Sequence, residues 1–168
     1  NTAVDGVAGA LAAALAAEQG VVIGSGGTAP AAVAGLAARG ARTVTVVARS
    51  AEKAAGALEV ARRSGVGAEF CDLQGAGLAD VVAAAQVVVN TIPADAVAPF
   101  ADVLAGTPVL LDAIYEPWPT PLAAAVAARG GHVISGLQML LNQAFTQVEL
   151  FTGLPAPKEA MRAVLPGA

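Results

Sequence analysis

Short runs of apolar, mostly β-branched residues alternate with longer alanine-rich segments along the whole chain. Several of the short runs are almost continuous in valine, isoleucine and leucine, which is typical of strands covered by helices on both faces. The pattern predicts strands at Val21–Ile23, Thr43–Val47, Ala68–Cys71, Val87–Asn90, Val109–Asp112 and His132–Ile134.

The alanine-rich segments have helical period and lie between these strands. They predict helices at Pro30–Arg39, Ala51–Ser64, Leu78–Ala85, Val97–Leu104 and Pro121–Ala128. Two more are expected at the ends, from about Gly6 to Glu18 and from Leu137 to Phe151, and the proline-punctuated tail should hold one short helix. Strands that alternate with helices imply right-handed crossovers and a parallel sheet. We therefore expect an α/β fold, a doubly wound, Rossmann-type nucleotide-binding domain over residues 1–168, with flanking N- and C-terminal helices.

Composition narrows the class of protein. Hydrophobic residues make up 56% of the chain but aromatic residues only 4%, and the apolar runs are shorter than the roughly 20 residues of a membrane helix. A net charge of −4 disfavours nucleic-acid binding. A lone Cys71 and the lack of a cleavable leader lead us to expect a cytoplasmic protein. No residue cluster has metal-ligand spacing, so no metal is expected; His132 is expected at the surface and Cys71 in packing.

A glycine-rich stretch follows the first predicted strand directly. Gly24-Ser25-Gly26-Gly27-Thr28-Ala29 has the form G-x-G-x-x-A and opens into a helix, with Pro30 in the first turn. In dinucleotide-binding folds the first glycine permits a tight turn, the second lets the pyrophosphate approach the backbone, and a small third residue lets helix and strand pack closely. A plain flexible turn is the alternative. The position between first strand and first helix favours a dinucleotide site.

The end of the second strand indicates which dinucleotide. Sites for NAD usually have an acidic residue there to bind both ribose hydroxyls, but Ala48 stands in its place. Arg49, Ser50 and Lys53 follow and could bind a phosphate. Ordinary surface cations at a helix start are the alternative. The missing acid and the clustered donors favour NADP.

The C-terminal half resembles the shikimate dehydrogenase family. The resemblance rests on DAIYEPWPTPL (112–122), ISGLQMLLNQAF (134–145) and ELFTG (149–153), together with GSGGTA, ARSAEK and NTIP (90–93) in register. The alanine-rich composition is similar to that of actinobacterial members. The resemblance implies NADP-linked reduction of 3-dehydroshikimate to shikimate, in the pathway to aromatic amino acids. The family has an N-terminal substrate domain and a C-terminal nucleotide domain, and this chain matches only the second.

The resemblance also implies roles for individual residues. Substrate is expected to contact Tyr115 and Gln143, although a strand-end cap and a solvent-exposed amide are the alternatives. Met139 is expected beside the nicotinamide, although an apolar helix position is normally core. The expected cofactor-binding residues are Gly24, Ser25, Gly26, Gly27, Thr28, Ala48, Arg49, Ser50, Lys53, Thr91, Ile92, Ala113, Gly136 and Met139. Nearby, Asp112 is expected to orient the loop of Tyr115, and Trp118 to anchor that loop by burial.

The first residues depart from the family at its catalytic aspartate. Asn1-Thr2-Ala3 overlays the family's N-T-D without gaps, so that Ala3 takes the place of the acid. A shifted register would use Asp5 instead; otherwise Asp5 is a carboxylate at a helix start, favoured by capping and by the helix dipole. The family's catalytic lysine belongs to the substrate domain. We therefore expect the chain alone to bind NADP(H) weakly and not to turn over.

Two other functions remain open from the sequence. One is a non-catalytic NADP-binding or regulatory module. The other is a quinate/shikimate or amino-shikimate dehydrogenase, which shares these motifs. The oligomeric state is not indicated by the sequence.

Overall fold

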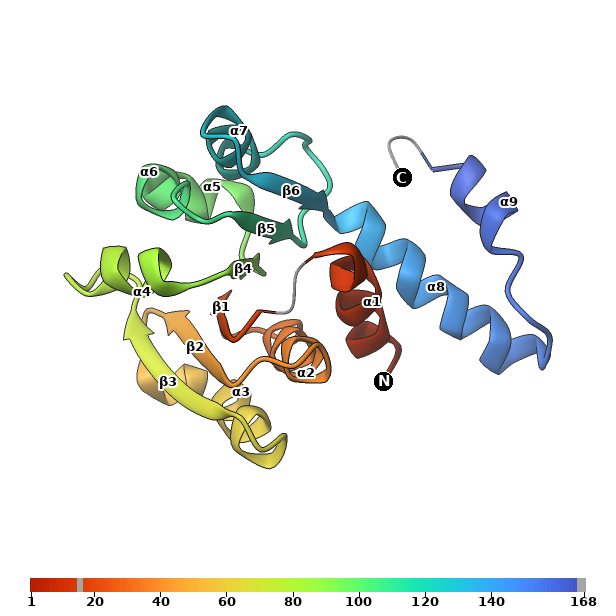
Figure 1. Ribbon diagram of the computed structural model, residues 1–168, viewed down its shortest axis with the longest axis horizontal. Coiled ribbons are helices and arrows are strands. Elements are labelled where there is room, and N and C mark those ends of the chain that lie inside the picture. Colours follow the sequence, from red (N-terminus) through yellow and green to blue (C-terminus); the bar gives the residue numbers. More distant parts are fainter. Residues whose placement is uncertain (15–16, 166–168) are drawn as a thin grey trace.

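The computed structural model describes residues 1–14 and 17–165. All strands of the sheet run parallel, in the order β3-β2-β1-β4-β5-β6 (Figure 1). The strands are β1 (Gln19–Ile23), β2 (Thr43–Ala48), β3 (Gly67–Asp72), β4 (Val87–Asn90), β5 (Val109–Asp112) and β6 (His132–Ser135). Each prediction of a strand is confirmed, with at most two residues added at an end.

Helices connect the successive strands and lie on both faces of the sheet, and further helices precede β1 and follow β6. They are α1 (Thr2–Ala10), η1 (Leu11–Ala13), α2 (Ala29–Ala38), α3 (Ala51–Arg63), α4 (Leu78–Ala84), α5 (Ala94–Val97), η2 (Ala98–Phe100), α6 (Ala101–Leu104), α7 (Pro121–Ala128), α8 (Gly136–Thr152) and α9 (Lys158–Ala163). The predicted doubly wound α/β fold is thereby confirmed.

Alternate residues of each strand enter two separate cores. In β1, Val22 packs with α1, α2 and α3, whereas Val21 and Ile23 pack with α4, α6 and α7. Side chains that alternate between two buried faces explain why the central strands β1, β4 and β5 are almost continuously apolar, whereas the edge strand β3 contains Glu69 and is mostly exposed. The strand order reverses between β1 and β4, and ligands of open α/β sheets bind outside the carboxyl ends of the strands at such a point.

Two predicted helices have different bounds in the structure. The first begins at Thr2, because the Asn1 side chain caps it by accepting from the Ala3 N–H at 3.1 Å. It gives way to the turn η1 at Leu11, and the last residues of the predicted Gly6–Glu18 helix include 15 and 16, which lie outside the described residues. The predicted Val97–Leu104 helix is three short pieces, α5, η2 and α6, because Pro99 has no N–H to continue a helical ladder.

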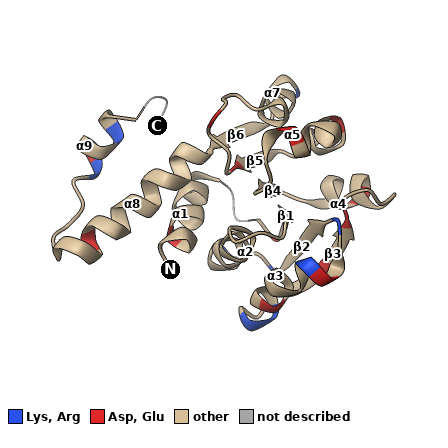
Figure 2. Cartoon of the chain, turned by 180° about the vertical axis from the view of Figure 1, so that it is seen from behind, with Lys and Arg blue, Asp and Glu red and all other residues tan. Residues whose placement is uncertain are grey.

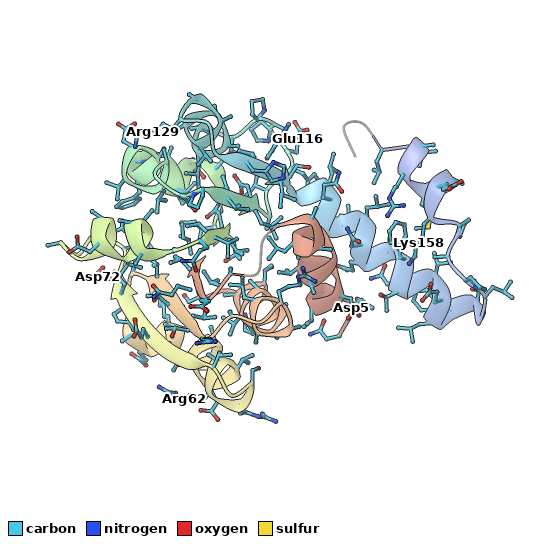
Figure 3. All side chains as sticks on the ribbon, viewed as in Figure 1. Asp5, Arg62, Asp72, Glu116, Arg129 and Lys158 are labelled. Atoms are coloured by element: carbon cyan, nitrogen blue, oxygen red, sulfur yellow. The ribbon has the colours of Figure 1, made fainter. Side chains whose placement is uncertain are left out.

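The long helix α8 leaves the end of β6 beside α1, and α9 returns alongside it (Figure 1). Lys158 Nζ and the Arg162 guanidinium lie 5.4 and 5.3 Å from the centre of the buried Phe145 ring. Two cation–π contacts from successive turns of α9 therefore fasten it to α8. In Figure 3, Lys158 is seen on α9 facing α8, and Asp5 on α1.

Candidate functional site

The glycine loop turns sharply between β1 and α2. Gly24 has φ +116°, and a Cβ there would collide with the Thr91 hydroxyl and lie 2.8 Å from Ile92 Cγ2. A Cβ at Gly26 or Gly27, by contrast, would meet nothing within 4 Å. Ala29 is fully buried at the start of α2. The loop thus has a constrained first glycine, open space over the next two, and the small residue that the close packing of helix and strand needs.

The first turn of α2 follows the glycine loop directly. Thr28 is the N-cap residue but makes no side-chain capping bond, Pro30 occupies the first turn as predicted, and the Ala29 N–H donates to the Gly26 carbonyl at 3.1 Å. The positive end of the helix dipole favours an anion at this position. The geometry therefore suits a pyrophosphate.

A cavity of about 190 Å³ lies beside the glycine loop. It is lined by Gly24, Ser25, Gly26, Val47, Ala48, Arg49, Leu73 and Ile92. The structure thereby brings together residues from the carboxyl ends of β1, β2 and β4 that the sequence placed in the cofactor site. No acidic side chain is among those that line it.

The residues after β2 form the cationic end of this site. Arg49 is exposed, and the ion pairs formed within the described residues involve neither Arg49 nor Lys53. Ser50 caps α3 by accepting from the Lys53 N–H at 3.5 Å, which leaves its hydroxyl proton free to donate. Glu52 in the same first turn is the nearest acid along the chain. A phosphate beside Ala48 would meet a guanidinium, a hydroxyl and the N-terminus of α3.

Thr91 and Ile92 are held against the glycine loop. The Thr91 hydroxyl donates to the Ile23 carbonyl at 2.7 Å, and the Thr91 N–H donates to the same oxygen at 2.9 Å. Because Gly24 has no side chain, the Thr91 side chain fits directly over it. The loop after β4 and the phosphate loop are therefore one packed unit.

A buried polar cluster closes the ends of β4 and β5. Asn90, Asp112 and Thr120 are each 0% exposed. The Asp112 carboxylate accepts from Asn90 Nδ2 at 2.9 Å and from the Thr120 hydroxyl at 2.6 Å. It also accepts from the Ile114 N–H at 3.2 Å, so the carboxylate is bonded to the start of the loop that contains Tyr115. Asn90 and Thr120 were not predicted to contribute, although an Asn at a strand end and a Thr-Pro helix start were visible signals.

Ala113 and Gly136 lie in contact at the carboxyl ends of β5 and β6. A Cβ on Gly136 would collide with the Ala113 carbonyl, and the Ala113 N–H donates to the Asn90 carbonyl at 2.9 Å. Tyr115 follows at 47% exposed, with its ring available to a ligand. The loop that contains Glu116 lies beyond the ends of β5 and β6 (Figure 3).

Burial of Trp118 is a wrong prediction. Its side chain is 40% exposed and lines a cavity of about 430 Å³ together with His132 to Ser135, the first turn of α8 and the end of α1. The buried Asp112 and Thr120, rather than the indole, anchor this loop.

Met139 and Gln143 lie on α8, where it packs against α1. Met139 is 9% exposed and belongs to a hydrophobic core, which leaves little of the side chain to face a ligand. Gln143 is half-buried, and its Cβ would lie 3.1 Å from a Cβ on Gly6. Neither residue, nor Tyr115, lines the 190 Å³ cavity.

Ala3, which takes the place of the family's aspartate, and the alternative Asp5 both lie in the first turns of α1. Ala3 is half-buried, whereas Asp5 is exposed. Asn1, and not Asp5, caps the helix, so the capping role considered for Asp5 is wrong; Asp5 is a first-turn acid that suits the helix dipole.

The remaining titratable candidates lie outside the site. His132 is exposed, as predicted. Cys71 is buried in the core next to α4, and burial, with a smaller contribution from Asp72, raises the pKa of its thiol above the ordinary value of 9.0. Lys and Arg are found mainly on α3 and α9, and most of the ribbon is neither acidic nor basic (Figure 2).

Similarity to known proteins covers nearly the whole chain. The profile of the Shikimate 5'-dehydrogenase C-terminal domain matches residues 136–165. A crystal structure of shikimate 5-dehydrogenase from Mycobacterium fortuitum is 61% identical, with a TM-score of 0.93 over 99% of this chain and 61% of that one. The Mycobacterium tuberculosis shikimate dehydrogenase is 62% identical, with a TM-score of 0.92 over 97% of this chain and 61% of that one. The chain is therefore similar in sequence and in fold to about three fifths of each of these shikimate dehydrogenases.

Shikimate dehydrogenases of more distant organisms give the same result. The NADP(+) shikimate dehydrogenase of Halorubrum lacusprofundi is 40% identical over 156 residues, which are 90% of this chain and 54% of that protein. The chain thus spans about half the length of such relatives. Among its described residues, no helix has the length and apolarity that crossing a membrane requires.

Proposed function

We propose that this chain is the NADP-binding domain of a shikimate dehydrogenase that reduces 3-dehydroshikimate to shikimate. The observation that supports this most is the cavity bounded by Gly24, Gly26 and Arg49, with Ala48 where an NAD site has an acid. Relatives named as NADP(+) shikimate dehydrogenases support the same cofactor. The substrate would be shared with a second domain, since the relatives are about twice as long. We place the reaction in the cytoplasm.

Each part of the site has a defined task in this proposal. Gly24 to Thr28 and the first turn of α2 bind the pyrophosphate, and Arg49, Ser50 and Lys53 bind the 2′-phosphate beside Ala48. Thr91 and Ile92 lie along the cofactor, and Ala113, Gly136 and Met139 border its nicotinamide end. Bound NADPH supplies the hydride. Tyr115 and Gln143 contact hydroxyl or carboxylate groups of the substrate.

Proton transfer is the step for which this chain lacks a group. A ketone that accepts hydride also needs a proton at its oxygen, and a positioned acid contributes about 10²- to 10⁴-fold to such a step. Ala3 stands where the family has its aspartate, and a methyl group cannot relay a proton. The family's catalytic lysine belongs to the other domain. The lysines of this chain lie elsewhere, Lys53 on α3 at the phosphate end and Lys158 on α9. We therefore propose that the chain alone binds NADP(H) but does not reduce 3-dehydroshikimate, and measurable turnover by the purified chain contradicts this.

Replacement of Arg49 tests the cofactor assignment. Arg49→Ala removes charge-assisted hydrogen bonds to the 2′-phosphate, which predicts an NADPH affinity about 10- to 100-fold lower and an unchanged NADH affinity. Titration of cofactor fluorescence measures both affinities.

The matched control is Arg63→Ala, at the opposite end of the same helix α3. It removes an equal charge without touching the cavity, so its NADPH affinity should equal that of the parent chain. A preference for NADPH that survives Arg49→Ala, or that is lost equally in Arg63→Ala, rules out the role of Arg49.

A further inference from the structure

The Asp112 carboxylate joins three segments of the site. Both of its oxygens are used: Oδ1 accepts from Asn90 at the end of β4 and from the Ile114 N–H, and Oδ2 accepts from Thr120 at the start of α7. A carboxylate buried this deeply is costly unless such donors surround it, and apolar residues could fill the same space. Its donors lie at the end of β4 and in the loop after β5. The hydrogen bonds of Asp112 therefore fix segments at the carboxyl ends of the strands, where the candidate site lies.

One arm of this cluster reaches the cofactor cavity. Asn90 Nδ2 also donates to the Ile92 carbonyl at 3.0 Å, and Asn90 Oδ1 accepts from the Ile92 N–H at 3.3 Å. Ile92 lines the cavity beside Gly24. The side chain that holds Asp112 therefore also sets the position of a cavity wall.

The other side of the cluster is bonded to the loop of Tyr115, residues 113–120. Thr120 Oγ1 accepts from the Ala123 N–H at 3.0 Å while it donates to Asp112, so the same hydroxyl caps α7 and anchors the loop. Ile114 fixes the near end of the loop and Thr120 its far end. Tyr115 lies between these two anchors.

We propose that Asp112 is a positioning residue, which with Asn90 and Thr120 fixes Tyr115 relative to the wall of the cofactor cavity at Ile92. It touches neither cofactor nor substrate; it acts through the loop 113–120. The inference rests on the proposed function, which assigns Tyr115 to the substrate and Ile92 to the cofactor. The hydrogen-bonded linkage itself is a property of the protein without ligands. Loss of the linkage should loosen the loop and leave the phosphate site intact.

The loop contains its own reporter. Trp118 is the only tryptophan of the chain, so tryptophan emission comes from the loop alone. Trp118 is 40% exposed in the ordered loop, so release of the loop can raise its accessibility to acrylamide quenching by up to about 2.5-fold. This measurement requires no cofactor.

Thr120 offers a graded set of variants with a matched control. Thr120→Val keeps the shape of the side chain and removes its hydrogen bonds, while Thr120→Ser keeps the hydroxyl. Thr107→Val is the control, because Thr107 is also a buried threonine, bonded to the Val109 carbonyl at 2.9 Å at the opposite end of β5. Asp112→Asn is the stronger change, since it alters bonds to all three donors.

Quenching of Trp118 in the cofactor-free chain decides the proposal. Thr120→Val and Asp112→Asn should raise the quenching constant toward the 2.5-fold limit, whereas Thr120→Ser and Thr107→Val should match the parent. Circular dichroism and thermal unfolding establish that each variant is folded; if Asp112→Asn does not fold, the Thr120 pair decides alone. Parent-like quenching in folded Thr120→Val overturns the proposal, and so does equal quenching in Thr120→Val and Thr107→Val.

NADPH titration separates this inference from the proposed function. Thr120→Val should bind NADPH within about threefold of the parent, with weaker energy transfer from Trp118 to the bound cofactor. A parent chain that does not bind NADPH refutes the proposed function, but the quenching result still decides the linkage. An NADPH affinity that falls tenfold or more in Thr120→Val refutes the separation of loop and phosphate site.

Discussion

The first two glycines of the G-x-G-x-x-A sequence, Gly24 and Gly26, have different structural requirements. Gly24 needs a positive φ and has Thr91 and Ile92 where a side chain would lie, whereas Gly26 faces open space. The same substitution should therefore damage the fold at the first position and only the ligand site at the second.

Alanine at each position tests this difference. Gly24→Ala should lower the free energy of unfolding by about 1–3 kcal/mol, from backbone strain and overpacking. Gly26→Ala should unfold at the same denaturant concentration as the parent but bind NADPH at least about tenfold more weakly, because a methyl group occupies the approach of the pyrophosphate. A Gly26→Ala chain with parent-like NADPH affinity would place the pyrophosphate elsewhere.

Cys71 should be an unreactive thiol in the native chain. Burial raises its pKa above 9.0, so the thiolate that reacts with alkylating reagents is scarcer in the folded protein than in the unfolded one. Iodoacetamide at pH 8 should modify the native chain much more slowly than the urea-unfolded chain. Equal rates would contradict the burial of Cys71.

The same pKa shift predicts how stability depends on pH. A thiol with a raised folded pKa favours the folded state while both states are protonated, and this contribution is lost as pH rises from 9.0 through the folded pKa. The free energy of unfolding of the parent should fall in that range relative to Cys71→Ala, which has no thiol to titrate. Parallel curves for the two proteins would exclude the effect.

At the scale of single elements, α1 and α8 approach closely at two glycines. A Cβ on Gly6 would lie 2.8 Å from the Met139 carbonyl oxygen, and a Cβ on Gly9 would lie 2.8 Å from the Asn142 Cβ and 2.5 Å from its Oδ1. The amide of Asn142 could rotate, but the Met139 carbonyl and the Asn142 Cβ are fixed to the backbone of α8, so neither position has room for a methyl group.

Alanine should therefore destabilise the chain at both positions. Gly6→Ala and Gly9→Ala are each expected to lower the free energy of unfolding by about 1–3 kcal/mol, because overpacking outweighs the higher helix propensity of alanine. Chemical denaturation measures both, and a parent-like free energy of unfolding in either variant would contradict this account of the interface.

The sequence predicted elements well where one local signal was sufficient. Strands that are apolar on both faces, and helices that end at Gly40, Gly65 or Gly130 with positive φ, were predicted within two residues of their ends. The helix at Val97–Leu104 was wrong because its period outweighed Pro99 in the prediction, although proline interrupts a helical ladder. The exposure of Trp118 was not predictable, because it depends on the distant Asp112 cluster that anchors the loop instead.

In the candidate site too, features with a local signal were predicted and those that depend on distant contacts were missed. The phosphate loop and the missing acid at Ala48 are read from neighbours in sequence, and the structure brings them to one cavity. The contact of Asn90 with Asp112 depends on the register of β4 and β5, in which these two residues are aligned across strands. Register between strands is a property of the assembled sheet, so the cluster was missed.

At the scale of the whole molecule, the far end of α8 carries a large exposed apolar surface. Leu150, Phe151 and Leu154 are 72, 86 and 66% exposed, well away from both cores. Leu150→Gln and Phe151→Gln together should shorten retention on a hydrophobic-interaction column and leave the melting temperature unchanged, because these side chains contribute little buried area. A lower melting temperature would show that they pack against part of the chain after all.

The order of the strands divides the molecule into two halves with different tasks. In the proposed site, β1 to β3 with α2 and α3 bind the adenosine phosphates, and β4 to β6 with α8 hold the loop of Tyr115 and the nicotinamide end; the halves meet where the Thr91 hydroxyl lies over Gly24. Coenzyme preference and this domain's own contribution to substrate preference are then encoded in separate stretches of sequence, before and after about residue 87. A recombinant domain that joins the first stretch of one family member to the second stretch of another should take its coenzyme preference from the first parent and its Tyr115 loop from the second, provided that the glycine and the threonine at the junction are kept.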